Sequence, residues 1–326
     1  FVGMEDLLGT YNNGQGDFFM RKKWKYYIDR MLTFALIGIL LPLFVTIICQ
    51  RMRLEEVIYG TYDAITEAAE REGGEELEEQ LPFILAKEIR ADAEDAALMA
   101  QCVIARTTLY DAAARGEEQP AAFSEEELRQ ALGETYEKVM ERLETCVEET
   151  SGQVLSWNGG YAYAAYHAIS AGSTRDMSRS AEAAVPYLPA VECPADLTAE
   201  GTLSVIYCEE TDILKQCAEH FAEADVSAVS EIQVTERDAA GYVQQVMLGE
   251  YVCTGEAFRE AMGWNSACFT ITQMGENVRI VTRGLGHGYG LSQNEARAMA
   301  QEGTSYEEIL QYFFPGTTLV TADQIK

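Results

Sequence analysis

Glycine occupies every second position of residues 284–291, and His287 and Tyr289 stand between the glycines. Because side chains alternate between the two faces of an extended strand, this spacing predicts a strand with His287 and Tyr289 on one face and bare backbone on the other. A substrate chain could approach the bare face closely while the protein holds the imidazole and the phenol. A neighbouring backbone could pack against that face equally well, so the spacing leaves both interpretations open.

Helices are predicted directly after this segment. Ser292 and Glu295 have the spacing of a capping box and begin a helix that we expect to run through Gln301. Thr304 and Glu307 repeat the spacing and predict a second helix, which must end before the Pro-Gly pair that follows. These helices would fix the position of the glycine-rich segment and of its side chains, His287 and Tyr289.

Another helix is predicted upstream, over residues 96–108, where apolar residues occupy every side of the helix. A helix that is apolar all round is a buried one. Its strongly polar side chains are Gln101 and Arg106, and a buried guanidinium is costly unless acceptors meet it. We therefore expect Arg106 to have a buried partner.

Strand patterns occupy the middle and the end of the chain. Residues 153–169 alternate around a turn at 158–160, which predicts a hairpin. The later elements are a short helix near 256–262 and strands near 242–248, 268–272 and 278–283. Helices and strands without a βαβ rhythm indicate an α+β fold of mixed helices and antiparallel strands.

The 326-residue chain is strongly acidic, with 53 Asp and Glu against 24 Lys and Arg and a formal net charge of −29. Such a surface repels the phosphates of nucleic acid, so nucleic-acid binding is not expected. The eight cysteines include no close C-x-x-C pair, and most stand in apolar contexts that suit small buried side chains. A disulfide stays open, with its pair unassigned.

Residues 31–49 form a run without a charged side chain, about the length that spans a bilayer core. Basic residues are denser before the run than after it, so the positive-inside rule places the N-terminus in the cytoplasm. A cleaved signal peptide is the rival, but the run is long for one and no small-x-small site follows it. We predict a single-pass protein of the cell membrane, with a cytoplasmic tail at 1–30, one transmembrane helix at 31–49, a helical stalk at 50–76 and an extracytoplasmic region at 77–326.

Blocks along this exterior region are similar to the stage II sporulation protein D family. The stretch GLGHGYGLSQNEARAMAQEGTSYEEILQYFFPGTTL resembles the family's Gly-His-Gly motif, its Ser-Gln step and its closing Pro-Gly-Thr turn. LEEQLPFILAKEI and AALMAQCVIARTTL resemble the family's opening block. TSGQVLSWNGG, PYLPAV and GYVQQVMLGEYVCTGEAFREAMGW stand between them in the family's order. The resemblance covers about residues 77–319 and identifies the exterior region as the catalytic one.

The resemblance implies that Glu88 is the catalytic acid of a lytic transglycosylase. Residues 82–86 and Ile89 are apolar and would desolvate the carboxyl, which raises its pKa as a general acid near neutral pH requires. In the family's reaction, Glu88 would protonate the oxygen between N-acetylmuramic acid and N-acetylglucosamine. It would then accept the proton of the muramic C6 hydroxyl, which closes a 1,6-anhydro end. No second carboxylate is required, since the internal hydroxyl replaces water.

The resemblance also predicts residues that hold the glycan or position Glu88. They are Gln101, Arg106, His167, His287, Tyr289, Ser292 and Gln293. The chain departs from the family where Ile89-Arg90 and Met99 replace a proline soon after the acid and a lysine in the next helix. It departs again where Glu295 replaces a glycine. These departures leave Glu88 intact and concern the binding residues.

The implied setting is endospore engulfment, in which the protein acts on peptidoglycan glycan strands beside a stem-peptide amidase and a membrane partner. No cofactor or metal is expected. His167 and Cys193 are the one pair considered for the structural zinc of some family members, and four ligands cannot be named. Two alternatives stay open: a non-catalytic wall-binding or amidase-enhancing protein on the same fold, and an enzyme of the vegetative wall.

Overall fold

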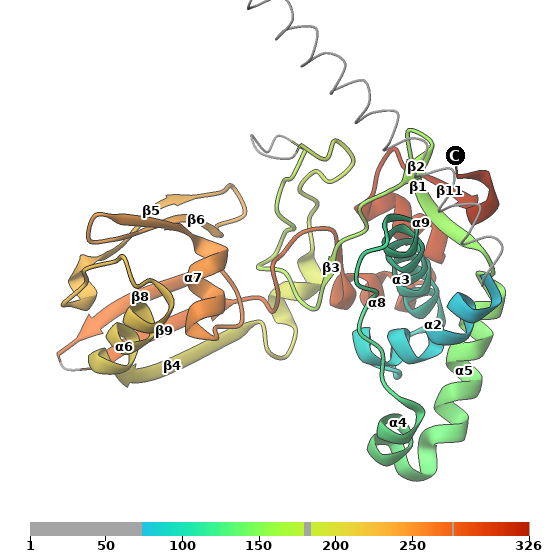
Figure 1. Cartoon of the computed structure of the whole chain (residues 1–326), viewed down its shortest axis with the longest axis horizontal. Helices are drawn as coiled ribbons and strands as arrows, with labels where there is room; N and C mark the ends of the chain where they lie inside the picture. The colour runs from blue at the N-terminus through green and yellow to red at the C-terminus, as the bar shows by residue number, and fades with distance from the viewer. Residues whose placement is uncertain (1–73, 179–183, 276, 326) are drawn as a thin grey trace, which may run out of the picture. The chain divides into compact units, whose positions relative to one another are not determined.

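The computed structural model describes residues 74–178, 184–275 and 277–325 (Figure 1). No helix in these ranges is long and apolar enough to cross a bilayer. The tail and anchor predicted for residues 1–49 lie outside the described residues, as does nearly all of the stalk predicted at 50–76. Its last residues belong to the first turn of a helix that begins at Gly74, so the predicted boundary at 76 falls inside that helix.

The helices around the predicted catalytic residue are α2 (Gly74–Glu88), α3 (Asp95–Arg115), α4 (Glu125–Leu132), α5 (Tyr136–Glu149), α8 (Gln293–Gln301) and α9 (Tyr306–Phe313). Helix α8 begins and ends as predicted. Helix α9 begins one residue later than predicted, because the capping box is formed by Ser305 and Glu308. A hydroxyl one residue further along the chain therefore satisfies the free N–H groups of the first turn.

Helix α3 packs against neighbours on both of its sides (Figure 1). Leu98 and Leu109 contribute to a core shared with α2 and α5, while Val103 and Ile104 contribute to a second core shared with α8, α9 and the first strand. Because both sides are covered, the helix is apolar all round, and the prediction of a buried helix is confirmed.

Short strands join this helical part. β1 (Gln153–Trp157) pairs antiparallel with β2 (Gly160–Tyr161) and β11 (Thr318–Thr321), and the turn between β1 and β2 has positive φ at Asn158 (53°) and Gly159 (86°). Two successive positive φ angles characterise the tight hairpin turn that the Asn-Gly sequence predicts.

One strand pair differs from the prediction of an antiparallel arrangement. β3 (Tyr166–His167) and β10 (Leu291–Ser292) run parallel, with Tyr166 opposite Leu291 and His167 opposite Ser292. Residues more than a hundred positions apart thereby meet beside α8. This pair joins the two chain segments that sequence reasoning had assigned to the substrate site.

The remaining elements form a β-rich part with its own core. One sheet has the order β4-β9-β8, with β4 (Leu203–Glu209), β8 (Phe269–Met274) and β9 (Asn277–Arg283); the other has the order β5-β6-β7, with β5 (Ile232–Arg237), β6 (Val243–Leu248) and β7 (Tyr251–Thr254). Helices α6 (Glu210–His220) and α7 (Gly255–Met262) share a core with both sheets around Phe258, Trp264 and Phe269. The α+β prediction is confirmed.

Candidate active site

Glu88 is the last residue of α2, and its half-buried carboxyl faces α3. Gln101 of α3 donates from Nε2 to Glu88 Oε2 over 2.8 Å. The phenol of Tyr166 in β3 hydrogen-bonds to the same carboxyl. The partners of Glu88 are thus an amide and a phenol, and both are neutral donors.

Gln293, the first residue of α8, determines which way the Gln101 amide points. Its Nε2 donates to the backbone carbonyl of Glu88 over 2.8 Å and to Oε1 of Gln101 over 3.2 Å. Because the oxygen of Gln101 accepts from Gln293, its nitrogen is the end that meets Glu88. The two glutamines, both predicted as site residues, therefore keep a donor against the carboxylate.

Burial dominates the acidity of Glu88. Desolvation raises its pKa from 4.5 to about 7, and the hydrogen bonds from Gln101 and Tyr166 lower the pKa without cancelling that rise. The raised pKa that the apolar neighbours predicted is confirmed. A carboxyl of this kind can both donate and accept a proton near neutral pH, as general acid–base chemistry requires.

A cleft of about 580 Å³ opens beside Glu88. Its walls come from the end of α2, from Ala168 and Ile169 after β3, and from Gln293 and Arg297 of α8. The rim is polar. Arg297 pairs with Glu94 over 3.1 Å, and Arg90 and Asp92, which follow α2, form an exposed ion pair nearby. A cleft of this volume falls within the size range of small-ligand sites.

Arg106 lies in a different polar network, and the expectation that it has a buried partner is confirmed. Its side chain is fully buried, and it binds Glu78 at 2.7 and 3.0 Å. It also donates to Thr150 Oγ1, to the Gln153 carbonyl and to the Val147 carbonyl. These contacts use all five guanidinium donors, so none is left for a glycan.

The glycine-rich segment is not an extended strand, and that prediction is wrong. Its glycines have positive φ angles of 84°, 109°, 83° and 69° at positions 284, 286, 288 and 290. A Cβ at Gly290 would stand 1.9 Å from the Ala165 carbonyl oxygen, and one at Gly288 would stand 2.6 Å from the Tyr242 ring. Of the two interpretations that the spacing left open, packing against neighbouring protein is therefore the one that holds.

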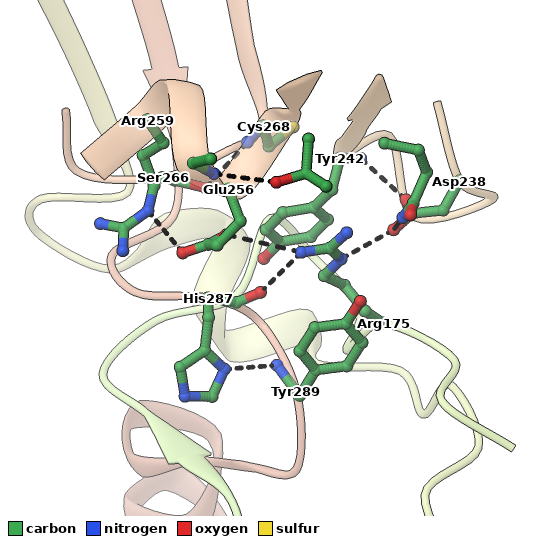
Figure 2. Close-up of polar contacts among 12 residues, drawn as sticks. Arg175, Asp238, Tyr242, Glu256, Arg259, Ser266, Cys268, His287 and Tyr289 are labelled. Atoms are coloured by element: carbon green, nitrogen blue, oxygen red, sulfur yellow. Dashed lines mark hydrogen bonds and ion pairs between the residues drawn. The ribbon is translucent and has the colours of Figure 1, made fainter. Parts of the chain in front are cut away.

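Arg175 anchors this segment and was not predicted from the sequence. It lies between the rings of Tyr242 and Tyr289, at 5.0 and 4.4 Å from their centroids (Figure 2). It pairs with Asp238 over 2.8 Å and donates to the His287 carbonyl over 3.2 Å. Tyr289 therefore stacks on a buried cation.

The two motif histidines also make contacts within the protein. His287 Nδ1 accepts from the Tyr289 N–H over 3.1 Å (Figure 2), and burial lowers the pKa of His287. His167 is buried, its Nδ1 lies 3.0 Å from the Tyr289 carbonyl, and burial lowers its pKa to about 3. Because a carbonyl only accepts, Nδ1 of His167 carries the proton and the ring is neutral. Neither histidine lines the cleft.

Ser292 is fully buried and caps α8, and its hydroxyl donates to Asp196 over 2.7 Å. Of the eight predicted residues, the structure thus brings three into mutual contact: Glu88 and Gln293, which line the cleft, and Gln101, which is buried behind them and bonds to both. Ser292 caps the helix that begins with Gln293. Arg106, His167, His287 and Tyr289 hold neighbouring parts of the fold.

Tyr166, Arg175 and Asp196 were not predicted from the sequence. Tyr166 stands directly before His167, but only the pairing of β3 with β10 directs it toward Glu88. Asp196 is a single acid in the segment CPADLT, and Arg175 is one arginine among many. No local pattern distinguishes such residues from solvated charges, because long-range contacts bury them.

The described residues include no group of three or more His, Cys, Asp or Glu that could hold a metal ion. Cys193 and the other six described cysteines are free thiols, so the disulfide left open in the sequence is not formed among them.

A half-buried carboxyl that accepts a hydrogen bond from an amide at the wall of a cleft has the features of a general acid–base site. Residues 75–157 match the family model described as stage II sporulation protein. The chain is 27% identical over 270 residues to stage II sporulation protein D of Bacillus subtilis (strain 168), covering 76% of this chain and 75% of that protein. It is 26% identical over 261 residues to the protein of that name from Bacillus amyloliquefaciens, with the same coverage.

A further relative is the amidase enhancer of Bacillus subtilis (strain 168), which is 28% identical over 226 residues, or 54% of this chain and 32% of that protein. The matched residues 75–157 include α3 and all of α2 after Gly74, and with them both Glu88 and Gln101. The resemblance to the stage II sporulation protein D family that the motifs indicated is confirmed.

Proposed function

We propose that the chain is a membrane-anchored lytic transglycosylase that cleaves peptidoglycan glycan strands outside the cell membrane during endospore engulfment. The observation that carries the proposal is the Glu88 carboxyl, which has a pKa of about 7 and neutral hydrogen-bond partners at the wall of the cleft. The likeness to stage II sporulation protein D supports the sporulation setting. The uncharged run at 31–49 supports the anchor.

In the proposed reaction, protonated Glu88 donates its proton to the oxygen between N-acetylmuramic acid and N-acetylglucosamine as the glycosidic bond breaks. The resulting carboxylate then takes the proton of the muramic C6 hydroxyl, whose oxygen bonds to the anomeric carbon. Gln101 and Tyr166 stabilise the carboxylate form between the two steps, because both donate hydrogen bonds to it. The products are a 1,6-anhydro-muramic end and a new N-acetylglucosamine end.

A second carboxylate is the feature that would favour hydrolysis instead, since two-carboxylate glycosidases activate water or form a covalent intermediate with it. The other carboxylate that lines the cleft is Glu200, and it is exposed. An exposed carboxylate is poorly suited to hold a fixed water against an anomeric carbon. This favours the internal hydroxyl as the nucleophile.

Mass spectrometry of glycan strands treated with the full chain tests the proposal. Strands stripped of stem peptides, and strands that retain them, serve as parallel substrates. We expect 1,6-anhydro-muramic ends from at least one of them. Products heavier by one water would identify a hydrolase, and the absence of cleavage from both substrates would overturn the enzymatic proposal.

The second candidate is a non-catalytic protein that stimulates an amidase, which the likeness to the amidase enhancer supports over half of the chain. In either case we propose a stem-peptide amidase and a membrane protein of the engulfment machinery as partners. Glu88→Gln separates the two functions. Stimulation of a purified amidase that survives this substitution, together with an absence of glycan cleavage by the unaltered chain, would favour the second candidate.

A further inference from the structure

Asp196 is a fully buried carboxylate in the short 3₁₀ helix η2 (Pro194–Thr198). Its Oδ2 accepts from the Ser170 N–H and from the Ser292 hydroxyl, each over 2.7 Å. Its Oδ1 accepts from Asn294 Nδ2 over 3.0 Å. Three chain segments that are distant in sequence therefore meet at one side chain.

The partners of Asp196 are neutral, and no ion pair among the described residues includes it. A buried carboxylate costs free energy unless donors or a positive potential compensate it. Two of its donors, the N-cap residue Ser292 and Asn294 in the first turn, lie at the N-terminus of α8, where free N–H groups create a local positive potential. The carboxylate and the first turn of α8 therefore stabilise each other.

The segments that Asp196 joins line the cleft beside Glu88. Ser170 follows Ala168 and Ile169, which line one wall, and Asn294 lines another together with Gln293. The Asn294 N–H also donates to the Ala168 carbonyl over 3.1 Å. A displacement of the Asp196 contacts would shift both walls relative to α2.

We propose that Asp196 is a positioning residue of the active site, which holds the first turn of α8 so that Gln293 keeps the Gln101 amide turned toward Glu88. Asp196 touches neither the cleft nor Glu88 and acts through Ser292 and Asn294. Its effect on cleavage rests on the proposed function. Its effect on Gln293 does not.

Glu295 provides a matched control, because it is another buried carboxylate at the same junction of η2 and α8. Its carboxyl accepts from the Ala195 N–H over 2.8 Å and from the Asp196 N–H, both within η2, and not from the segments that line the cleft. Asp196→Asn and Glu295→Gln each convert a buried carboxyl into an isosteric amide. A general loss of packing would affect both variants, whereas the positioning role would separate them.

Hydrogen exchange of the Gln293 side-chain amide, followed by NMR on the full chain, tests the positioning directly. Both amide hydrogens donate in the structure, one to Glu88 and one to Gln101, so exchange should be slow. We expect Asp196→Asn to accelerate it by about tenfold or more, which equals loss of roughly 1.4 kcal/mol of protection. Unchanged exchange in a folded Asp196→Asn variant, or equal acceleration in Glu295→Gln, would overturn the proposal.

Cleavage kinetics provide the second readout. Asp196→Asn should lower kcat by about 10- to 100-fold with KM changed less than about threefold, since the reacting groups are misplaced and the glycan contacts are kept. In a Gln293→Ala background the same substitution should have little further effect, whereas additive losses would contradict action through Gln293. If Asp196→Asn fails to fold, Ser292→Ala removes one of its donors and should show the same signature. If the unaltered chain cleaves nothing, the proposed function fails and the exchange experiment alone decides the role of Asp196.

Discussion

Helix α2 presents a glutamate near each end to α3, and the two have different partners. Glu78, in the first turns, forms a two-oxygen ion pair with the fully buried Arg106 and also accepts from the Tyr110 phenol. Glu88, in the last turn, meets Gln101 and Tyr166. The same pair of helices therefore supports a charged contact at one end and a neutral one at the other.

The two contacts differ in their chemical role. The guanidinium of Arg106 binds both carboxylate oxygens of Glu78, and this ion pair serves to hold the helices together. Neutral donors stabilise the carboxylate of Glu88 less than burial destabilises it, so its pKa rises to about 7. One contact is structural, while the other leaves a proton that can be exchanged with a substrate.

The largest expected effect comes from comparing Glu88→Gln with Glu78→Gln for both cleavage and stability. Glu88→Gln should lower the yield of 1,6-anhydro products by about 10²- to 10⁴-fold, because an amide cannot supply the proton, and circular dichroism should show an intact fold. Glu78→Gln should leave the chemistry of folded molecules unchanged but destabilise the chain, because Arg106 keeps its charge and loses its anion. Equal losses of cleavage in two folded variants would contradict the assignment of a chemical role to Glu88 and a structural role to Glu78.

The next effect concerns the cation of the structural pair. Arg106→Ala should destabilise the chain by about 3–5 kcal/mol, since it leaves Glu78, the Val147 carbonyl and the partly buried Gln153 carbonyl without their donor. Arg297→Ala should cost less, about 1 kcal/mol, because its side chain is 31% exposed and solvent reaches its ion pair with Glu94. Chemical denaturation measures both. Equal midpoints for the two variants would show that the Arg106 network does not stabilise the fold.

The unfolding free energy of Glu88→Gln, measured as a function of pH, tests the raised pKa of Glu88. Between pH 4.5 and about 7 the unfolded chain ionises at this position while the folded chain keeps its proton, so Glu88 lowers stability as the pH rises. The variant removes that cost. We expect its gain in unfolding free energy over the unaltered chain to be near zero at pH 4.5 and to grow to roughly 3 kcal/mol above pH 7. A gain that does not depend on pH would contradict the raised pKa.

The smallest effect should come from Tyr166→Phe, which removes one neutral donor from Glu88. Because that donor stabilises the carboxylate, its loss should raise the pKa of Glu88 and shift the alkaline fall of cleavage to higher pH. The cost in rate should be about 0.5–1.5 kcal/mol, or a few-fold. A matched Tyr163→Phe variant, at an exposed tyrosine, should leave the pH profile unchanged. A shift toward lower pH would show that Tyr166 is not a donor to Glu88.

Much of the fold could be predicted, because its signals are local. The buried helix α3, the hairpin at Asn158 and Gly159, and the helix α8 follow from apolar periodicity, turn residues and capping spacing. The raised pKa of Glu88 also followed from its apolar neighbours in sequence. Each of these depends on residues within a few positions of one another.

The glycine-rich segment shows where local reasoning fails. Its alternation matches a strand, yet every one of its glycines adopts positive φ, and residues 165–171 and the Tyr242 ring leave no room for a Cβ. Tyr166 and Asp196 were missed for the same reason. Their roles depend on the parallel pairing of β3 with β10 and on a 3₁₀ helix a hundred residues before α8, and no periodic pattern encodes either contact.

Titration of the Glu88 carboxyl is the most direct test of its proposed role as a general acid. In the full chain labelled with ¹³C at glutamate side-chain carboxyls, the Glu88 signal is identified by its disappearance in Glu88→Gln and followed from pH 3 to pH 9. We predict a midpoint near 7, well above the ordinary value of 4.5, with the fold intact throughout the transition. A Glu88 midpoint at or below 4.5 would show that the carboxyl is ionised at neutral pH, and it would contradict both the contrast with Glu78 and the acid role proposed for Glu88.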